Sequence, residues 1–345
     1  MAFAALQRFA IRRMLSLPSP LLRLASGGAA VHRGGRTLDP RMQALGAGAD
    51  LGLAVLTPAD ARLRCARHLE MLRAPAERGV TAEALTLAAA GRDIAARAYR
   101  PDSQDPTAPI LVFAHAGGGV LGDLEACDGL CRILALVMRC PVVSVDYRLA
   151  PEHRFPAGLD DFIAACRWAR DAAPRFGASA GAIMAGGEGI GAAFAAAACQ
   201  TFRALGEPQP RLQILFYPWT DLASETPSMS TYADTYPLSR GQLDWLVGHY
   251  LGPRDDPADP RLSPLRAASV ADLAPAVVAT AGFDPLADQG EAYARRLAET
   301  GVPLAYRRYD ALTHGFAAFA GPVPAADAAC REVAGLARGL LEGAA

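Results

Sequence analysis

Lysine is absent from this sequence of 345 residues, so all 34 basic residues are arginines. The absence excludes Schiff-base chemistry and the P-loop type of nucleotide site, because both depend on a lysine amine. The sequence also lacks an HExxH motif, a CxxC pair and any close cluster of histidine and cysteine. We therefore expect no metal site and no cofactor. The formal net charge of −1 gives no global attraction to nucleic acid, so we expect no nucleic-acid partner.

Disulfide-type cysteine spacing is missing as well. The seven cysteines are odd in number, and most lie in apolar or helical stretches, as Cys166 and Cys199 do. This pattern favours buried free thiols in a reducing compartment. We therefore expect a cytoplasmic protein.

The first 36 residues form a basic segment with no acidic residue before Asp39. Arginine and proline interrupt its apolar runs, which are shorter than the ~20 residues needed to cross a bilayer, and no secretory cleavage pattern follows them. We expect residues 1–36 to be an ordinary N-terminal extension. Weak contact of this extension with a membrane surface is the alternative.

Short apolar runs alternate with helical patterns from residue 90 onward. Several runs are continuous, as in ILVFA and AVVATA, which is typical of strands buried on both faces of a parallel sheet. The expected strands are residues 94–100, 110–115, 142–148, 182–187, 212–217, 276–281 and 304–309. The expected helices are residues 123–138, 159–173, 190–205, 287–300 and 325–341. This rhythm predicts an α/β fold with an open, mostly parallel sheet and helices on both faces.

Two regions interrupt the alternation. Residues 37–80 favour helix, with 59–72 the clearest segment, and residues 219–265 are rich in proline, serine and aspartate around a helix at 240–250. Insertions at the carboxyl ends of parallel strands tend to cover a ligand site. We therefore expect one domain over residues 37–345, in which both regions form a helical cap.

Three consecutive glycines, Gly117, Gly118 and Gly119, follow the apolar run ILVFA. Glycine permits a sharp turn and leaves backbone N–H groups uncovered, and such groups stabilise the oxyanion of a tetrahedral acyl intermediate. We expect the N–H groups of Gly117 and Gly118 to act in this way, and a tight turn without a ligand is the alternative. His115 begins the turn and is expected to support the loop.

A second loop follows the apolar run VVSV and reads DYRLAPE. It offers no obvious nucleophile. We expect Asp146 and Arg148, with Asp160 and Asp161 close by in the sequence, to provide a buried Asp–Arg arrangement that fixes this loop.

These motifs in combination resemble the hormone-sensitive-lipase family of esterases and lipases. HAGGGVLGDL at 115–124 and DYRLAPE at 146–152 are similar to the family's His-Gly-Gly-Gly and Tyr-Arg-Leu-Ala-Pro-Glu patterns, although Ala116 replaces a glycine. WTDL at 219–222 and DPLADQGEAYARRL at 284–297 are also in the family's style. The resemblance runs from about residue 38 to the C-terminus. It implies an α/β-hydrolase fold with a helical cap and a Ser-Asp-His triad that hydrolyses carboxylic esters.

The resemblance assigns the acid of the triad to Asp284 and the base to His314. Asp284 follows the apolar run AVVATAG and begins the DPL motif, and His314 follows the next expected strand. Their order in the chain agrees with that of α/β hydrolases. Two alternatives remain: Asp284 caps the helix after it, or His314 is a surface loop residue.

The nucleophile position holds glycine. The expected strand–turn–helix elbow lies at residues 182–194, where Gly187 and Gly191 take the flanking glycine positions and Gly189 stands at the sharp turn. Glycine has no side-chain atom with which to form an acyl-enzyme, so covalent catalysis at this position is excluded. The backbone N–H of Ile190 is the expected third donor to the oxyanion.

Three other residues are weak substitutes for the nucleophile. Ser179 lies in the sequence GASAG at 177–181, but a helix precedes it and a strand follows, which is the reverse of an elbow. Glu188 adjoins the turn and is expected to point away from the pocket. Cys127 belongs to the helix after the glycine turn.

Three functions remain open. The first is an esterase for small apolar carboxylic esters, impaired or inactive because glycine replaces the serine. The second is a non-covalent lyase, dehydratase, cyclase or hydrolase in which His314, oriented by Asp284, acts as a general base. The third is a non-catalytic protein that binds a small ligand. In each case the expected partner is a small, apolar acyl or carbonyl compound, and a homodimer is left open.

Overall fold

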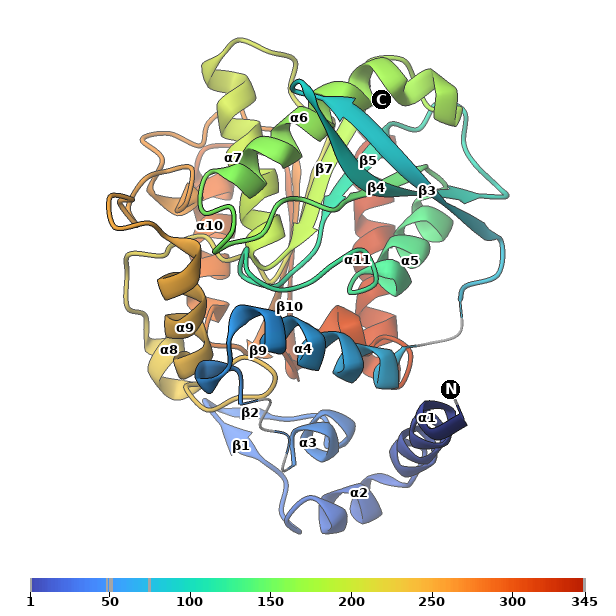
Figure 1. The fold of residues 1–345 in the computed structure, drawn as a ribbon, viewed down its shortest axis with the longest axis vertical. Helices are drawn as coiled ribbons and strands as arrows, with labels where there is room; N and C mark the ends of the chain where they lie inside the picture. The colour runs from blue at the N-terminus through green and yellow to red at the C-terminus, as the bar shows by residue number, and fades with distance from the viewer. Residues whose placement is uncertain (1, 48, 50–51, 74–75, 344–345) are drawn as a thin grey trace.

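The apolar runs of the sequence form one twisted sheet at the centre of the fold (Figure 1). The computed structural model describes residues 2–47, 49, 52–73 and 76–343. Within these residues the sheet has eight strands: β3 (Val80–Ala89), β4 (Arg92–Pro101), β5 (Ile110–Ala114), β6 (Val142–Val145), β7 (Ile183–Glu188), β8 (Gln213–Phe216), β9 (Ala276–Phe283) and β10 (Leu304–Thr313). Their order is β10-β9-β8-β7-β5-β6-β4-β3. The pairs from β10 to β6 are parallel and β4 is antiparallel to both of its neighbours, so the predicted mostly parallel sheet is confirmed.

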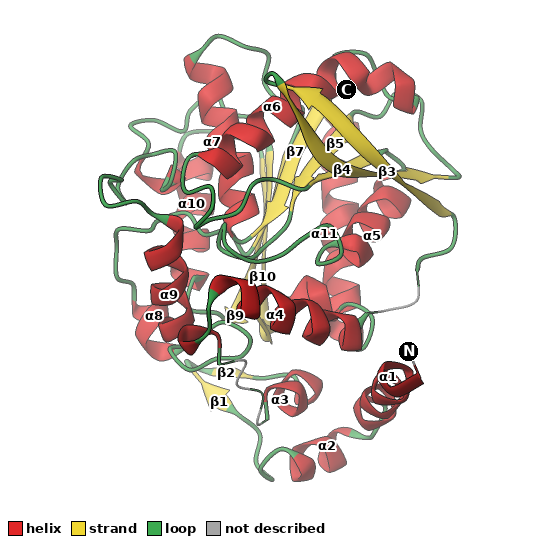
Figure 2. Ribbon diagram, viewed as in Figure 1, coloured by secondary structure: helices red, strands yellow, loops and turns green. Residues whose placement is uncertain are grey.

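Helices cover both faces of this sheet, as the alternation of patterns predicts (Figure 2). These helices are α5 (Asp128–Met138), α6 (Ala157–Ala172), α7 (Ile190–Ala204), α10 (Ala287–Glu299) and α11 (Pro324–Gly343). Helices α6, α7 and α10 pack on one face, and α5 and α11 pack on the other. The core is therefore divided into two layers by the sheet.

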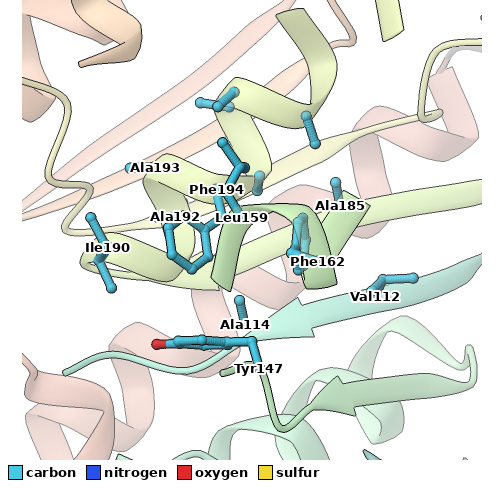
Figure 3. Packing of buried hydrophobic residues seen from close by; sticks show 14 of the residues in the cluster. Val112, Ala114, Tyr147, Leu159, Phe162, Ala185, Ile190, Ala192, Ala193 and Phe194 are labelled. Atoms are coloured by element: carbon cyan, nitrogen blue, oxygen red, sulfur yellow. The ribbon is translucent and has the colours of Figure 1, made fainter. Parts of the chain in front are cut away.

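Strand β5 is buried along its whole length because alternate residues enter opposite layers. Val112 packs in the layer of α6 and α7, whereas Phe113 packs in the layer of α5 and α11. Figure 3 shows the first layer, where Phe162 of α6 and Phe194 of α7 lie over the strands. A continuous apolar sequence such as ILVFA follows from this burial on both sides.

The largest differences between the expected and the observed elements concern β3 and the start of α5. Strand β3 was not expected, because most of its residues are exposed at the edge of the sheet and its sequence lacks a continuous apolar run. The helix expected from residue 123 begins instead at Asp128. The carboxylate of Asp123 accepts hydrogen bonds from the backbone N–H groups of Glu125 and Ala126, which holds this segment in a turn.

The remaining elements gather at the end of the fold where β7 reaches its carboxyl end (bottom of Figure 1). They are α1 (Ala2–Leu15), α2 (Ser19–Ala25), β1 (His32–Arg33), β2 (Arg36–Thr37), α3 (Pro40–Gly46), α4 (Pro58–Leu72), α8 (Pro227–Thr231) and α9 (Arg240–Tyr250). Helix α1 packs against α4, and Arg12 donates a hydrogen bond to the carbonyl oxygen of Arg73 at 2.7 Å. Arg36 pairs with Asp310 at 3.0 Å, which ties β2 to β10. No helix in the described ranges is long and apolar enough to cross a membrane.

Candidate active site

The turn between β7 and α7 brings Gly189 to the centre of the site. Gly189 has φ 55° and ψ −114°, a conformation that L-residues rarely adopt but glycine adopts readily. The turn is tight, because a Cβ added to Gly191 would lie 2.2 Å from the carbonyl oxygen of Ala114. Glycine is therefore required at 191 for the helix to start directly beside β5.

The side chains of Asp284 and His314 meet at the ends of neighbouring strands. Asp284 follows β9, is 1% exposed, and accepts a hydrogen bond from the backbone N–H of Leu286 at 2.8 Å. His314 follows β10, and its Nδ1 lies 2.9 Å from Oδ2 of Asp284. The carboxylate requires a proton on Nδ1, so the neutral ring presents Nε2 as a hydrogen-bond acceptor.

Nε2 of His314 faces the turn at Gly189. A Cβ added to Gly189 would lie 3.5 Å from this nitrogen and 3.8 Å from Cβ of Ala116, which are ordinary contact distances. A hydroxymethyl group therefore fits at position 189, with its oxygen within hydrogen-bonding reach of Nε2. The structure thus brings together Gly189, Asp284 and His314, which the sequence had placed at three separate strand ends.

The backbone N–H groups of Gly117, Gly118 and Ile190 are available to a ligand. None of the three donates a hydrogen bond to another described residue. The turn is fixed instead through the carbonyl oxygen of Gly117, which accepts from the N–H groups of Val120 and Leu121 at 3.1 and 2.9 Å. Free donors beside a cavity can hold the developing negative charge of a carbonyl oxygen.

His115 supports the glycine turn from beneath. It is fully buried, its ring stacks on that of Tyr147 with centroids 4.3 Å apart, and its Nδ1–H donates to the carbonyl oxygen of Ala116 at 2.7 Å. The hydroxyl of Tyr147 donates to the carbonyl oxygen of His115 at 2.9 Å. Burial lowers the pKa of the His115 imidazole, so the ring is neutral in this position.

The Asp–Arg pair of the following loop differs from the expectation for Asp146. The partner of Arg148 is Asp161, whose carboxylate is buried and accepts from Nε of Arg148 at 3.0 Å and from its backbone N–H at 2.9 Å. Arg92 also pairs with this carboxylate. Asp146 itself is exposed. Helix α6, which carries Asp161, thus fixes the loop, and Asp146 does not take part in the buried pair.

The weak substitutes for the nucleophile lie away from His314 or are already engaged. Ser179 precedes β7 and therefore lies at the opposite end of that strand from Gly189. Cys127 is buried, with its Sγ 3.2 Å from Oγ of Ser144. Neither side chain is positioned to attack a carbonyl group held beside His314.

Glu188 and Tyr217 form a buried pair that the sequence did not reveal. Both residues are almost fully buried, and the Tyr217 hydroxyl donates a hydrogen bond to the Glu188 carboxylate. The Tyr217 ring lies against the His314 ring, with centroids 4.8 Å apart. The only feature of the sequence that could have indicated a role for Tyr217 in the site is its position directly after β8. Glu188, expected to point away from the pocket, is one of the residues that line it.

Burial raises the pKa of the Glu188 carboxyl from 4.5 to about 7. Between these values the folded protein keeps a proton that the unfolded chain releases, so the free energy of unfolding falls as the pH rises through this window. Glu188→Gln removes this dependence and can still accept from Tyr217. We expect the variant to gain about 3 kcal/mol relative to the unmodified protein between pH 4.5 and 8. Urea unfolding at both pH values measures the difference, and a constant difference would contradict the shifted pKa.

A cavity of about 200 Å³ opens beside Gly189 and His314. Leucine side chains from the segment before α4 and from α9 and its approach supply part of its wall, namely Leu53, Leu238, Leu243 and Leu246. In the described part of the chain, no group of three or more His, Cys, Asp or Glu residues is arranged to hold a metal ion. The cavity thus joins an apolar wall to a histidine–aspartate pair and free N–H donors.

Known proteins are similar to this chain in sequence and in architecture. The family model described as the alpha/beta hydrolase fold matches residues 111–318. The chain is 41% identical over 311 residues to the carboxylic ester hydrolase LipN of Mycobacterium tuberculosis, covering 87% of this chain and 82% of LipN. It is 37% identical over 240 residues to an ethyl acetate hydrolase of Pseudomonas putida, covering 69% and 76%. Among solved structures, a serine-to-alanine mutant of LAE6 superposes on this chain with a TM-score of 0.80 at 40% sequence identity. LAE6 is an alpha/beta hydrolase enzyme from the metagenome of Lake Arreo in Spain, and the match covers 83% of this chain and 91% of LAE6. The chain therefore belongs to the α/β-hydrolase family, in its hormone-sensitive-lipase-like group of esterases.

Proposed function

We propose that this protein binds small, apolar carboxylic esters and polarises their carbonyl group, but cannot form an acyl-enzyme because Gly189 occupies the nucleophile position. One observation carries the proposal. A Cβ at position 189 would lie 3.5 Å from Nε2 of His314, whose Nδ1 is held by Asp284. Residue 189 is therefore where a serine hydroxyl would be activated, and glycine has no hydroxyl.

The choice of small, apolar esters rests on the cavity and on the relatives. A volume of about 200 Å³ with leucine side chains in its wall suits short acyl chains. The relatives include a carboxylic ester hydrolase and an ethyl acetate hydrolase. A groove of about 930 Å³ adjoins the cavity and shares Ala66, Leu69 and Ala126 with it, which gives a larger leaving group room to extend.

The experiment that tests the proposal is to introduce serine at position 189 and to measure hydrolysis of short-chain p-nitrophenyl esters. A large gain supports an esterase site that lacks only its nucleophile. No gain, with the pocket intact, would instead favour a general-base enzyme for another reaction or a binding protein. His314→Ala separates these two, because a binding protein keeps its ligand affinity and a general-base enzyme loses turnover.

A cytoplasmic location and a homodimer remain predictions.

We also propose that the N-terminal segment rests weakly on an anionic membrane surface. Exposed apolar side chains gather on α1 and α2, where Phe9 is 58% and Leu24 is 72% exposed. The apolar side chains that face the protein, among them Leu15 and Leu22, form a separate buried set. Arginines and no acidic residues accompany the exposed set before Asp39, which suits an anionic lipid surface.

Vesicle sedimentation tests this contact. We expect the protein to sediment with vesicles that contain phosphatidylglycerol and not with pure phosphatidylcholine, and we expect salt to weaken the binding. Phe9→Ser combined with Leu24→Ser should weaken binding about tenfold or more, because two apolar side chains leave the lipid. Leu205→Ser is the matched control, since Leu205 is 61% exposed at the end of α7. Equal losses in both variants would contradict the contact.

A further inference from the structure

The space beside Gly189 has two neighbours of different chemistry. The point that a Cβ on Gly189 would occupy is 3.5 Å from Nε2 of His314 and 3.8 Å from the methyl carbon of Ala116. The first neighbour is a hydrogen-bond acceptor, and the second is apolar. A molecule with one hydroxyl group and one or two carbons matches both neighbours.

His314 is prepared to take a proton from such a molecule. Its Nδ1–H donates to Asp284, so Nε2 carries the free lone pair, and no described residue forms a hydrogen bond with Nε2. The buried carboxylate of Asp284 stabilises the imidazolium that forms when Nε2 is protonated. The base is therefore oriented toward the space beside Gly189 without a protein hydroxyl to act on.

We propose that this site transfers an acyl group directly from a bound ester to a small primary alcohol, which binds between His314 and Ala116 beside Gly189. This inference rests on the proposed function and deepens it, because it names the acceptor and requires ester and acceptor to be bound together. No residue of the protein becomes acylated.

The reaction balances without another reagent. The alcohol oxygen gives its proton to Nε2 of His314 and forms a bond to the carbonyl carbon of the ester. The carbonyl oxygen takes the electron pair and becomes an oxyanion, held by the N–H groups of Gly117, Gly118 and Ile190. The oxyanion then returns its electron pair to re-form the C=O double bond as the bond from carbon to the leaving oxygen breaks, and the leaving alcohol takes the proton from Nε2. The products are a new ester and the released alcohol.

Water competes for the same position, and the wall of the cavity favours the alcohol. The methyl group of Ala116 and the side chain of Leu246, which lies over Gly118, provide apolar contacts next to the acceptor. Burying one CH₂ or CH₃ group in such surroundings favours binding of the alcohol about fourfold, an advantage that water cannot gain. We expect a small primary alcohol to fit beside Gly189 better than a branched one, because His314 and Ala116 both lie within 4 Å of this point.

The test uses the unmodified protein with p-nitrophenyl butyrate and methanol. We expect p-nitrophenol release to rise about tenfold as methanol increases to about 1 M, with methyl butyrate as the matching product by gas chromatography, because a bound acceptor reacts at high effective concentration. Release should show no initial burst, and ethanol should act more strongly than isopropanol. A methanol-independent rate, or a burst, would overturn the proposal.

Two variants complete the test, and circular dichroism verifies that each is folded. Gly189→Ala places a methyl group in the acceptor's space, and His314→Ala removes the base, so each should abolish the methanol-dependent rate. Methyl butyrate formation that persists in either variant overturns the proposal. The serine variant separates the two levels of inference: if Gly189→Ser hydrolyses the ester while the unmodified protein forms no methyl butyrate, direct transfer is wrong and the esterase site stands. An inactive serine variant instead contradicts the proposed function.

Discussion

Gly189→Ser is expected to raise the rate of p-nitrophenyl ester hydrolysis by about 10⁴–10⁶-fold, because removal of a triad member in a serine hydrolase costs factors of this size. The hydroxyl would lie within reach of Nε2 of His314, and the N–H groups of Gly117, Gly118 and Ile190 donate to no other described residue. The unmodified protein should keep only the slow rate that binding and oxyanion stabilisation provide. Steady-state assays with acetate and butyrate esters, together with the burst of the first turnover, measure this gain.

Two variants make the result specific for position 189. Gly189→Ala adds the same Cβ without an oxygen, so it should show no gain. Ser179→Ala in the Gly189→Ser protein should leave the new activity unchanged, because Ser179 precedes β7 at the other end of the strand. A serine-directed phosphonate should add its mass to the Gly189→Ser protein alone. Labelling of the unmodified protein would show that another nucleophile exists.

His314→Ala in the Gly189→Ser protein is expected to remove nearly the whole of this gain, about 10⁴–10⁶-fold in kcat. The base is lost, and the serine hydroxyl is then no more reactive than an ordinary alcohol. Asp284→Asn should cost about 10⁴-fold, because an amide in place of the carboxylate favours the wrong tautomer of His314. Measuring kcat and KM separately distinguishes lost chemistry from lost binding.

Both substitutions should leave KM close to that of the Gly189→Ser protein, since the cavity wall is built mainly from other side chains. Asp284→Asn keeps the size of the side chain and can still accept from the N–H of Leu286, so the loop after β9 should remain folded. An Asp284→Asn protein with full activity would contradict the assignment of the acid.

The sequence predicts the parallel strands of the sheet well because a strand that is buried on both faces consists of consecutive apolar residues. Strand β5 is the clearest example. Strand β3 lacks such a run of apolar residues because it lies at the edge of the sheet, where most of its residues are exposed to solvent. The start of α5 was predicted too early because a side chain, Asp123, caps a turn that local helix propensity does not reveal.

The family resemblance, together with their places after two expected strands, predicts Asp284 as the acid and His314 as the base. The structure places the two side chains 2.9 Å apart. Contacts between distant segments were not predictable from spacing. Tyr217 reaches Glu188 from another strand, and Arg148 binds the carboxylate of Asp161 rather than that of Asp146. Such partners depend on packing in three dimensions.

The backbone conformation of residue 189 has a consequence for the stability of the fold. Its φ of 55° and ψ of −114° are the mirror image of an ordinary extended conformation, which glycine occupies without penalty. Any L-residue held there costs of order 1–3 kcal/mol. Thermodynamic stability and acyl transfer through a serine therefore make opposite demands on this one position. Folding stability alone therefore favours glycine over serine at position 189.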